Sequence, residues 1–403
     1  MAIETALIVA PSRADNRIFG RPLLERLILS CERVGIKHFV VEAPAARRAE
    51  IEASLGDYRN HPDVTLVDTL DAAAVERAQL SPVAACIALS GNLVFFKSQL
   101  EQVLTESADK PGSIVRLTTT DADHGGEIAA GPCGELLRRG GINVNGGSLG
   151  ATLGEHFRTP IGELPFALNG RPEDREEAEL RLARSLRKET AAKDAPMARW
   201  VDRKLSWRIS MRLARTAITP NQVTIFNTLL GLTCGWLFST PGYWTRLLAA
   251  ILFLVSITID GVDGELARLK MSETKFGGKL DITTDNIVHV AVFIGIFVGC
   301  YRASGSIAYL WLMIMVLIGF GLCSYATYRS FSLRGAIAEK WLEGLDRWSG
   351  RDFAYLLVIL ALINRLEWFA WGTAFGTYVF AFGLIWLTAR KLPGQMSQDA
   401  RQS

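Results

Sequence analysis

Residues 260–285 read DGVDGELARLKMSETKFGGKLDITTD, and four carboxylates of this stretch lie in or beside apolar segments long enough to cross a bilayer. Ionisable groups in such segments are costly and usually functional. Because a helix turns by about 100° per residue, the acids Asp260 and Asp263 share one helix face with the small residues Gly264 and Ala267. One turn separates Asp281 from Asp285 on the next helix. Two neighbouring helices can therefore direct four carboxylates to one point.

A divalent cation is the natural partner of these acids. Four carboxylates without balancing bases repel one another, and hard cations prefer oxygen ligands, so the pattern predicts Mg²⁺ or Mn²⁺. Gly264 and Ala267 carry little side-chain bulk, which lets a ligand or another backbone approach closely. Arg268 adds a planar set of donors suited to phosphate oxygens. These features outline a pyrophosphate site.

The spacing resembles the signature of the CDP-alcohol phosphatidyltransferase family, in which D-x2-D-G-x2-A-R is followed, after eight residues, by G-x3-D-x3-D. All fixed positions are filled here, by Asp260, Asp263, Gly264, Ala267, Arg268, Gly277, Asp281 and Asp285. The resemblance implies that Asp260, Asp263 and Asp281 bind the metal. It also implies that Asp285 is the base that takes the proton of the acceptor hydroxyl and that it contacts a metal as well.

The family resemblance also implies a set of nucleotide neighbours: Asn221, Thr224, Gly264, Ala267, Arg268, Thr274 and Gly277. Simpler roles are open for some residues of the site. The acids could be solvated loop residues, and Arg268 could be an interfacial anchor. His289 lies one turn beyond Asp285, but a single histidine in a span is more often hydrogen-bonded to a neighbouring helix, so it is not assigned to the site.

The apolar residues are distributed unevenly along the 403-residue chain, of which 49% is hydrophobic. This predicts an α/β N-terminal domain with an open Rossmann-like sheet, fused to an all-α polytopic membrane domain of about six transmembrane helices. The expected spans are approximately 221–238, 246–267, 281–301, 307–327, 353–366 and 368–389. The expected parts are a nucleotidyltransferase-like domain at 1–170, a charged linker with an interfacial amphipathic helix at 171–215, the membrane domain at 216–392 and a polar tail at 393–403.

Charge and cysteine usage narrow the class and the location. A net charge of +3 is too small to indicate nucleic-acid binding. The six cysteines lack the paired spacing of a disulfide framework or a zinc site. Basic residues are concentrated at 171–215, before the first expected span, as is typical of a cytoplasmic flank. We expect an integral protein of a bacterial-type inner (plasma) membrane, with the soluble domain and the active site facing the cytoplasm.

The first 170 residues alternate buried strands with helices, for example in ALIVA at 6–10, FVVEA at 39–43 and ACIALS at 85–90. This order resembles nucleotidyltransferases that activate sugar phosphates and inositol phosphate. Where that family places a G-x-G loop, this chain has APSRADNR, and where it places a metal-binding Asp, this chain has Ser90, Gly91 and Asn92. Since an amide cannot supply an anionic metal ligand, we expect a degenerate domain with a structural or regulatory role.

The resemblance implies transfer of a phosphatidyl or other phosphoryl-linked group from a CDP-activated donor to an acceptor alcohol, with release of CMP. The expected donor is CDP-diacylglycerol, and the expected role is in phospholipid biosynthesis. A polar CDP-alcohol donor stays open, as do glycerol 3-phosphate, an inositol phosphate and a neutral alcohol as acceptors. Basic residues that could bind a phosphorylated acceptor are Arg329, Arg334 and Arg351, beside Asp352. The family likeness also implies a homodimer. The alternatives are a bifunctional protein whose first domain makes the donor, a divalent-cation transporter and a catalytically silent scaffold.

Overall fold

The structure, a computed structural model, describes residues 3–59, 61–71, 81, 83–119, 127–138, 155–159, 164–191, 203–332 and 353–399. The chain forms two compact units. The first comprises Met1–Ala192 together with two short pieces from further along the chain, Ala214–Thr216 and Leu269–Met271. The second comprises Lys193–Leu213, Ala217–Arg268 and Ser272–Ser403.

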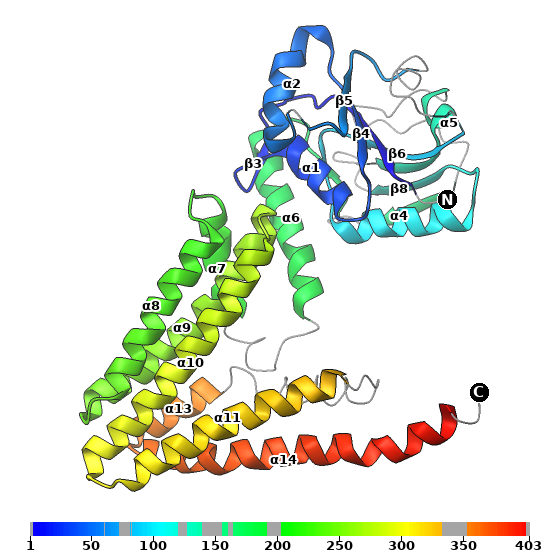
Figure 1. Cartoon of the computed structure of the whole chain (residues 1–403). Helices are drawn as coiled ribbons and strands as arrows, with labels where there is room; N and C mark the ends of the chain where they lie inside the picture. The colour runs from blue at the N-terminus through cyan, green and yellow to red at the C-terminus, as the bar shows by residue number, and fades with distance from the viewer. Residues whose placement is uncertain are drawn as a thin grey trace. The chain divides into compact units, whose positions relative to one another are not determined.

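The first unit is built on a seven-stranded open sheet of order β10-β8-β9-β6-β1-β4-β5 (Figure 1). Its strands are β1 (Thr5–Val9), β4 (His38–Glu42), β5 (Val64–Val67), β6 (Ala85–Ser90), β8 (Val115–Thr119), β9 (Glu127–Pro132) and β10 (Glu155–Thr159). All run parallel except β9, which is antiparallel to both of its neighbours, β6 and β8. The expected α/β class is confirmed, and the antiparallel strand makes the sheet mixed.

Short strand pairs and helices complete this unit. The pairs are β2 (Arg17–Ile18) with β3 (Arg21–Pro22) and β7 (Leu93–Val94) with β11 (Phe166–Ala167). The helices are α1 (Leu23–Glu32), α2 (Arg48–Ser54), α4 (Lys97–Asp109), α5 (Cys133–Arg138) and α6 (Pro172–Ala191), with short 3-10 turns η1 (Ala45–Arg47) and η2 (Gly56–Tyr58). Leu24, Leu27, Ile28 and Cys31 recur at helical spacing along α1 and enter the core beside β1 and β4.

The second unit is helical. Its helices are α7 (Arg203–Ala214), α8 (Pro220–Phe238), α9 (Tyr243–Lys270), α10 (Lys275–Ser304), α11 (Ala308–Ser332), α13 (Phe353–Leu362) and α14 (Leu366–Asp399). Six of them lie where the six apolar segments were expected. Within the described ranges, α9 and α10 are long and apolar enough to cross a bilayer. The expected number of six spans stays a prediction.

Glycines let α8 and α10 approach closely. A Cβ atom added at Gly295 would lie 2.1 Å from the backbone oxygen of Gly235, and one at Gly299 would lie 2.1 Å from the oxygen of Phe238. A Cβ at Gly231 would meet the side chain of Val288. Small residues at such positions are typical of helices that pack without a strong hydrophobic driving force. The pairing of α8 with α10 therefore depends on backbone contact.

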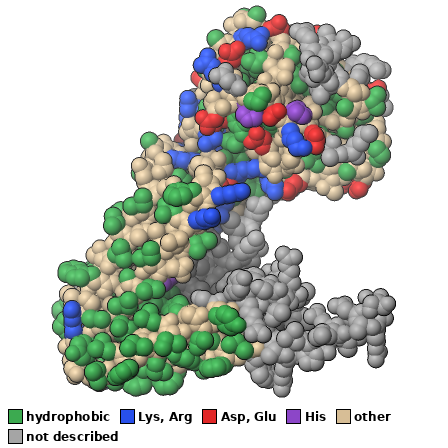
Figure 2. Space-filling view, viewed as in Figure 1, with side chains coloured by type: hydrophobic (Ala, Val, Ile, Leu, Met, Phe, Trp, Pro, Cys, Tyr) green, Lys and Arg blue, Asp and Glu red, His purple; other side chains and the backbone are tan. Residues whose placement is uncertain are grey.

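Large apolar side chains also cover the outside of the helical unit. Exposed examples occur along several of its helices: Phe226, Leu229 and Trp236 on α8, Trp244 on α9, Ile282 on α10, and Trp368, Phe375 and Val379 on α14. Figure 2 shows many hydrophobic side chains on the visible surface of these helices, whereas the α/β unit carries Lys, Arg, Asp and Glu among its other residues. Soluble proteins rarely expose apolar surface on this scale, and lipid is one environment that covers it.

The glycine contact yields a prediction about stability. We expect Gly295→Ala to destabilise the protein by about 1–3 kcal/mol, because the new methyl group meets a backbone oxygen that cannot move aside easily. Thermal unfolding in detergent micelles measures the change. Gly321→Ala on α11 is the control, since nothing in the described part of the chain lies within 4 Å of the added atom. Equal unfolding temperatures for the two variants would contradict close backbone packing.

Candidate active site

Three carboxylates from two helices meet in the second unit. Asp260 on α9 and Asp281 and Asp285 on α10 each offer one oxygen, and these atoms all lie within 4.8 Å of one another. All three side chains are partly buried. Oxygen donors of this kind, gathered at one point and still partly accessible, fit a hard divalent cation. The spacing of one turn predicted that Asp281 and Asp285 share a face of α10, and the structure brings Asp260 of α9 to them.

Asp263 was expected in the same cluster, but it does not join this group of three. Its side chain is buried, with 6% exposed, and it accepts a hydrogen bond of 2.5 Å from the Thr224 hydroxyl on α8. Its other oxygen accepts a bond of 2.5 Å from the backbone N–H of Gly264. Asp263 thus links α9 to α8 in this structure. Its role as a metal ligand stays a prediction.

A cavity of about 150 Å³ lies beside these acids. It is lined by Pro220, Asn221, Thr224, Asp263, Gly264, Ala267, Arg268, Ser272, Glu273, Thr274, Gly277, Gly278 and Asp281. The structure therefore brings all seven expected nucleotide neighbours to one cavity. Asp260 and Asp285 are not among its lining residues. Sequence reasoning did not assign Pro220, Ser272, Glu273 and Gly278 to the site, and of these Ser272 and Glu273 lie between the two halves of the signature.

Two polar atoms at this cavity are available to a ligand. Nε of Arg268 and Oγ of Ser272 are buried, and no hydrogen-bond partner for either occurs within the described ranges. Leaving buried donors unsatisfied is costly, so a ligand that accepts from them gains affinity. A Cβ at Gly264 would lie 3.5 Å from a guanidinium nitrogen of Arg268, which is ordinary van der Waals contact, so Gly264 lies directly beside the arginine.

The start of α10 adds favourable charge for an anion. Thr274 is its N-cap, and the Thr274 hydroxyl accepts a bond of 2.9 Å from the backbone N–H of Gly277. A Cβ at Gly277 would approach Thr274 Oγ1 to 3.0 Å and Asn221 Oδ1 to 3.2 Å. Glycine here keeps the cavity open, and the N-terminal end of a long helix carries partial positive charge. Thr274 therefore has a capping role whether or not it contacts a ligand.

Glu265 was missed by the sequence analysis. It is 3% exposed, and its two carboxylate oxygens accept hydrogen bonds from the hydroxyls of Ser206 (2.9 Å) and Ser210 (2.7 Å) on α7. The two serines lie one turn apart on the expected amphipathic helix, and this spacing could have indicated a polar contact on one face of that helix. A second bond, from Ser256 on α9 to Asn227 on α8, measures 2.8 Å. Polar bonds thus hold α9 from two sides.

The remaining expectations concern residues near the site. His289 packs between aromatic rings, with centroids 6.3 Å from Phe253 and 5.7 Å from Phe353. Arg334, Arg351 and Asp352 lie outside the described residues, as does the side chain of Arg329. The proposed site for a phosphorylated acceptor therefore stays a prediction.

In the first unit, Asn92 has a structural partner. This residue follows β6, is 3% exposed, and accepts a 2.9 Å hydrogen bond from the backbone N–H of Ser12 through its side-chain oxygen. The backbone N–H of Ala10 donates to Glu42 at 3.1 Å in the same loop. A Cβ at Gly91 would clash with the oxygen of Val9 at 2.6 Å. The loop after β1 is thus tied to the sheet by these residues.

Comparison with known proteins identifies the class. Residues 217–388 match the sequence profile of the CDP-alcohol phosphatidyltransferase family. Archaetidylinositol phosphate synthase of Pyrococcus horikoshii is 32% identical over 161 residues, which are 40% of this chain and 84% of that protein. The chain therefore belongs to the CDP-alcohol phosphatidyltransferase family.

Longer relatives match over a smaller share of their length. The bifunctional IPC transferase and DIPP synthase of Thermococcus kodakarensis is 32% identical over 197 residues, or 47% of this chain and 43% of that protein. The protein of the same name from Aquifex aeolicus is 39% identical over 121 residues, or 30% and 26%. The chain thus spans less than half of the length of these two relatives.

Two solved structures show weak similarity. Phosphatidylinositol phosphate synthase of Mycobacterium tuberculosis has a TM-score of 0.32 and 25% identity, covering 44% of this chain and 95% of that one. The inositol-1-phosphate CTP transferase of T. maritima has a TM-score of 0.33 and 13% identity, covering 44% and 96%. Scores of this size do not by themselves define the fold.

The carboxylate group predicts metal binding that can be measured directly. We expect Asp281→Asn to weaken binding of Mn²⁺ roughly tenfold or more. Loss of a residue that only hydrogen-bonds a metal ligand already has an effect of that size, and Asp281 is itself a candidate ligand. Electron paramagnetic resonance of free Mn²⁺ in a titration reports the affinity. Asp109→Asn, an exposed acid on α4, is the matched control. Unchanged affinity in Asp281→Asn would remove the assignment.

The Glu265 contacts predict a loss of stability. Glu265→Ala leaves two buried serine hydroxyls without their acceptor, which should lower the free energy of unfolding by about 1–3 kcal/mol. Thermal unfolding in detergent measures it. Glu101→Ala, at an exposed ion pair with Lys97, should change stability by less than about 0.5 kcal/mol. Equal effects would show that α7 is not held through Glu265.

Proposed function

We propose that the protein is an integral membrane CDP-alcohol phosphatidyltransferase. It transfers a phosphatidyl, or other phosphoryl-linked, group from a CDP-activated donor to the hydroxyl of an acceptor alcohol and releases CMP. The observation that carries this proposal is the meeting of three signature carboxylates within 4.8 Å, beside a cavity that the expected nucleotide neighbours line. Membership of the family supports the same reaction class.

The proposed domain division follows the sequence expectation: a nucleotidyltransferase-like domain at 1–170, a linker with an interfacial helix at 171–215, the membrane domain at 216–392 and a tail at 393–403. The exposed apolar side chains of the helical unit and the length of α9 and α10 support a membrane location with about six spans. Positive flanks support a cytoplasmic active site in a bacterial-type inner membrane.

Asp260, Asp281 and Asp285 would hold Mg²⁺ or Mn²⁺, and Asp263 would join them if its bond to Thr224 exchanges for a metal contact. The donor set fits such an ion, because all its members are carboxylate oxygens. When bound, the ion supplies positive charge that stabilises the negative charge developing on the phosphate oxygens.

The protein's own groups have separate tasks in the transfer. Arg268 binds the pyrophosphate of the donor through its guanidinium, with the Ser272 hydroxyl beside the same cavity. Asp285 accepts the proton of the acceptor hydroxyl. The hydroxyl oxygen forms a bond to the distal phosphorus of the donor, while the bond from that phosphorus to the oxygen bridging to CMP breaks. CMP leaves with the electron pair of the broken bond.

The donor and acceptor follow from chemistry and from relatives. CDP-diacylglycerol suits an active site beside apolar, lipid-compatible surface, since its tails can stay in the bilayer while its nucleotide reaches the cavity. Three relatives are named as synthases of archaetidylinositol phosphate or phosphatidylinositol phosphate, which favours a phosphorylated polyol as acceptor. Family likeness supports a homodimer.

A second candidate function concerns the first domain. Relatives named as bifunctional suggest that this domain also makes the CDP-alcohol donor. Asn92 argues against it, because its amide oxygen already binds the Ser12 N–H and carries no charge for a metal. Incubation with CTP and a phosphorylated polyol tests this candidate, and formation of a CDP-alcohol would establish it.

One assay tests the main proposal. Purified protein is incubated with CDP-diacylglycerol, Mg²⁺ or Mn²⁺, and a panel of alcohols and phosphorylated alcohols, and CMP release is followed. We expect Asp285→Asn to lower turnover by roughly 100-fold or more, because the general base is lost, and to spare CDP binding. Asn286→Ala, at an exposed neighbour on α10, is the control. Near-normal turnover in Asp285→Asn would remove the base assignment, and no CMP release with any acceptor would refute the function.

A further inference from the structure

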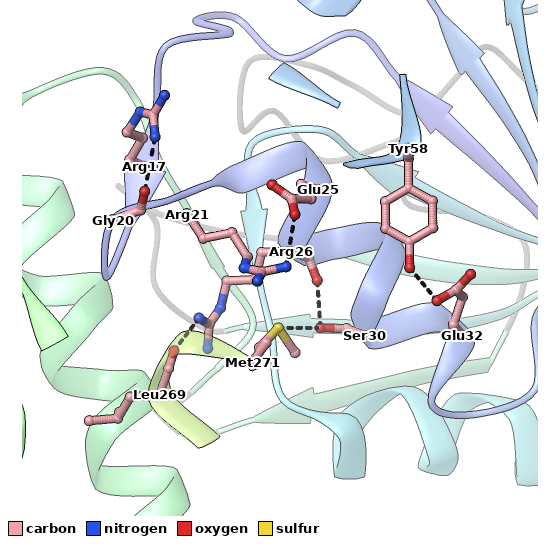
Figure 3. A network of polar contacts seen from close by, with 10 residues as sticks. All are labelled: Arg17, Gly20, Arg21, Glu25, Arg26, Ser30, Glu32, Tyr58, Leu269 and Met271. Carbon is pink, nitrogen blue, oxygen red and sulfur yellow. Dashed lines mark hydrogen bonds and ion pairs between the residues drawn. The ribbon is translucent and has the colours of Figure 1, made fainter. Parts of the chain in front are cut away.

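Arg26 of α1 bonds a piece of chain 243 residues further along. The first unit includes Leu269–Met271, which contains the last two residues of α9. Arg26 is 6% exposed, and its Nη1 donates a hydrogen bond of 2.5 Å to the backbone carbonyl oxygen of Leu269 (Figure 3). A guanidinium is rarely buried without a specific partner, and here the partner is this backbone carbonyl.

The accepting carbonyl explains why a buried cation is useful here. The last four carbonyl groups of a helix have no partner within the helix, and Leu269 is the penultimate residue of α9. The same end carries partial negative charge, which a nearby cation stabilises. Burial lowers the pKa of Arg26 to about 9, so the group is still charged at neutral pH. Arg26 therefore acts as a charged cap on α9.

Further contacts within the first unit hold the same segment. The Ser30 hydroxyl, one turn along α1 from Arg26, lies 3.9 Å from the sulfur of Met271 (Figure 3). Lys270 donates a bond of 2.6 Å from Nζ to the backbone oxygen of Thr216. Met271 has a φ of 52°, which is uncommon for a residue with a side chain. This conformation ends α9, so the contacts fix where the helix stops.

The segment joins the two halves of the signature. Arg268 precedes it directly, and Ser272 follows it, with the Ser272 N–H donating 2.9 Å to the oxygen of Ala267. All three of these residues line the donor cavity. The three residues of Leu269–Met271 therefore connect Arg268 at the cavity to Ser272 and to the start of α10, which carries Asp281.

We infer that Arg26 is a positioning residue of the transferase reaction, which caps α9 and thereby holds the connection that places Arg268 and Ser272 at the donor cavity. This inference rests on the proposed function. It gives the α/β domain a part in the reaction that requires no catalytic group of its own. It also gives a role to a buried arginine in a domain that has Asn92 at the position where a metal-binding Asp was expected.

A merely structural role makes a different prediction. The guanidinium of Arg26 also lies 5.9 Å from the ring centre of Phe19, so its loss could loosen the first unit as a whole. Loss of the cap alone would act on the end of α9. Backbone hydrogen exchange separates these cases, because the Ser272 N–H reports on the last turn and the amides of β1 and β4 report on the sheet.

The test compares Arg26→Met and Arg26→Lys in the full chain with wild type, measuring kcat, KM for CDP-diacylglycerol and hydrogen exchange. We expect Arg26→Met to lower kcat at least tenfold and to speed exchange at residues 269–272 with the sheet unchanged. Arg26→Lys, which keeps the cation, should recover part of both. Arg48→Met, at an exposed ion pair with Glu52, is the control and should match wild type.

Two results would overturn the inference. One is wild-type kcat in Arg26→Met. The other is a lower kcat with exchange raised evenly across the strands of the seven-stranded sheet and unchanged at residues 269–272. If Arg26→Met does not fold, Arg26→Gln takes its place under the same two criteria. If wild type itself releases no CMP, the proposed function fails, and faster exchange at residues 269–272 still decides whether Arg26 caps α9.

Discussion

Repulsion between carboxylates held close together is the constraint on which the site depends. Asp260, Asp281 and Asp285 lie within 4.8 Å of one another, and bringing like charges together is unfavourable unless positive charge is supplied. The divalent cation that we propose would supply it, and the surrounding helices would hold the acids in place until it binds. The close packing of α8 on α10 through glycine and the bonds of Thr224 and Ser256 between α8 and α9 serve that purpose.

Polar side chains of α7 and α8 form hydrogen bonds to different faces of α9. Thr224 of α8 bonds Asp263, whereas the serines of α7 bond Glu265, two residues further along α9 and therefore about 200° around it. Arg26 satisfies the end of the same helix at Leu269. The rotation and the end point of α9 are thus set by polar groups, which are directional, while apolar packing contributes bulk stability.

Local pattern was sufficient for several features. The strands at β1, β4 and β6, the helices at the six apolar segments and the placing of Asp281 and Asp285 on one face of α10 all follow from periodicity within one element. The family resemblance implied the seven nucleotide neighbours that line the cavity, of which Asn221 and Thr224 lie on α8, outside the signature. The antiparallel direction of β9 could not be anticipated, because strand direction depends on pairing partners far away in the sequence.

The sequence alone determined that two consecutive helices carry acids at helical spacing and that their flanks suit a membrane, since spacing and hydropathy are local properties. Only the tertiary structure decided that Asp263 bonds Thr224 and is outside the group of three, that Glu265 accepts from two serines on α7, and that Arg26 bonds Leu269. Each of these contacts joins residues 39 or more positions apart. Which polar groups meet over such separations depends on how the helices pack, and no periodicity in the chain encodes it.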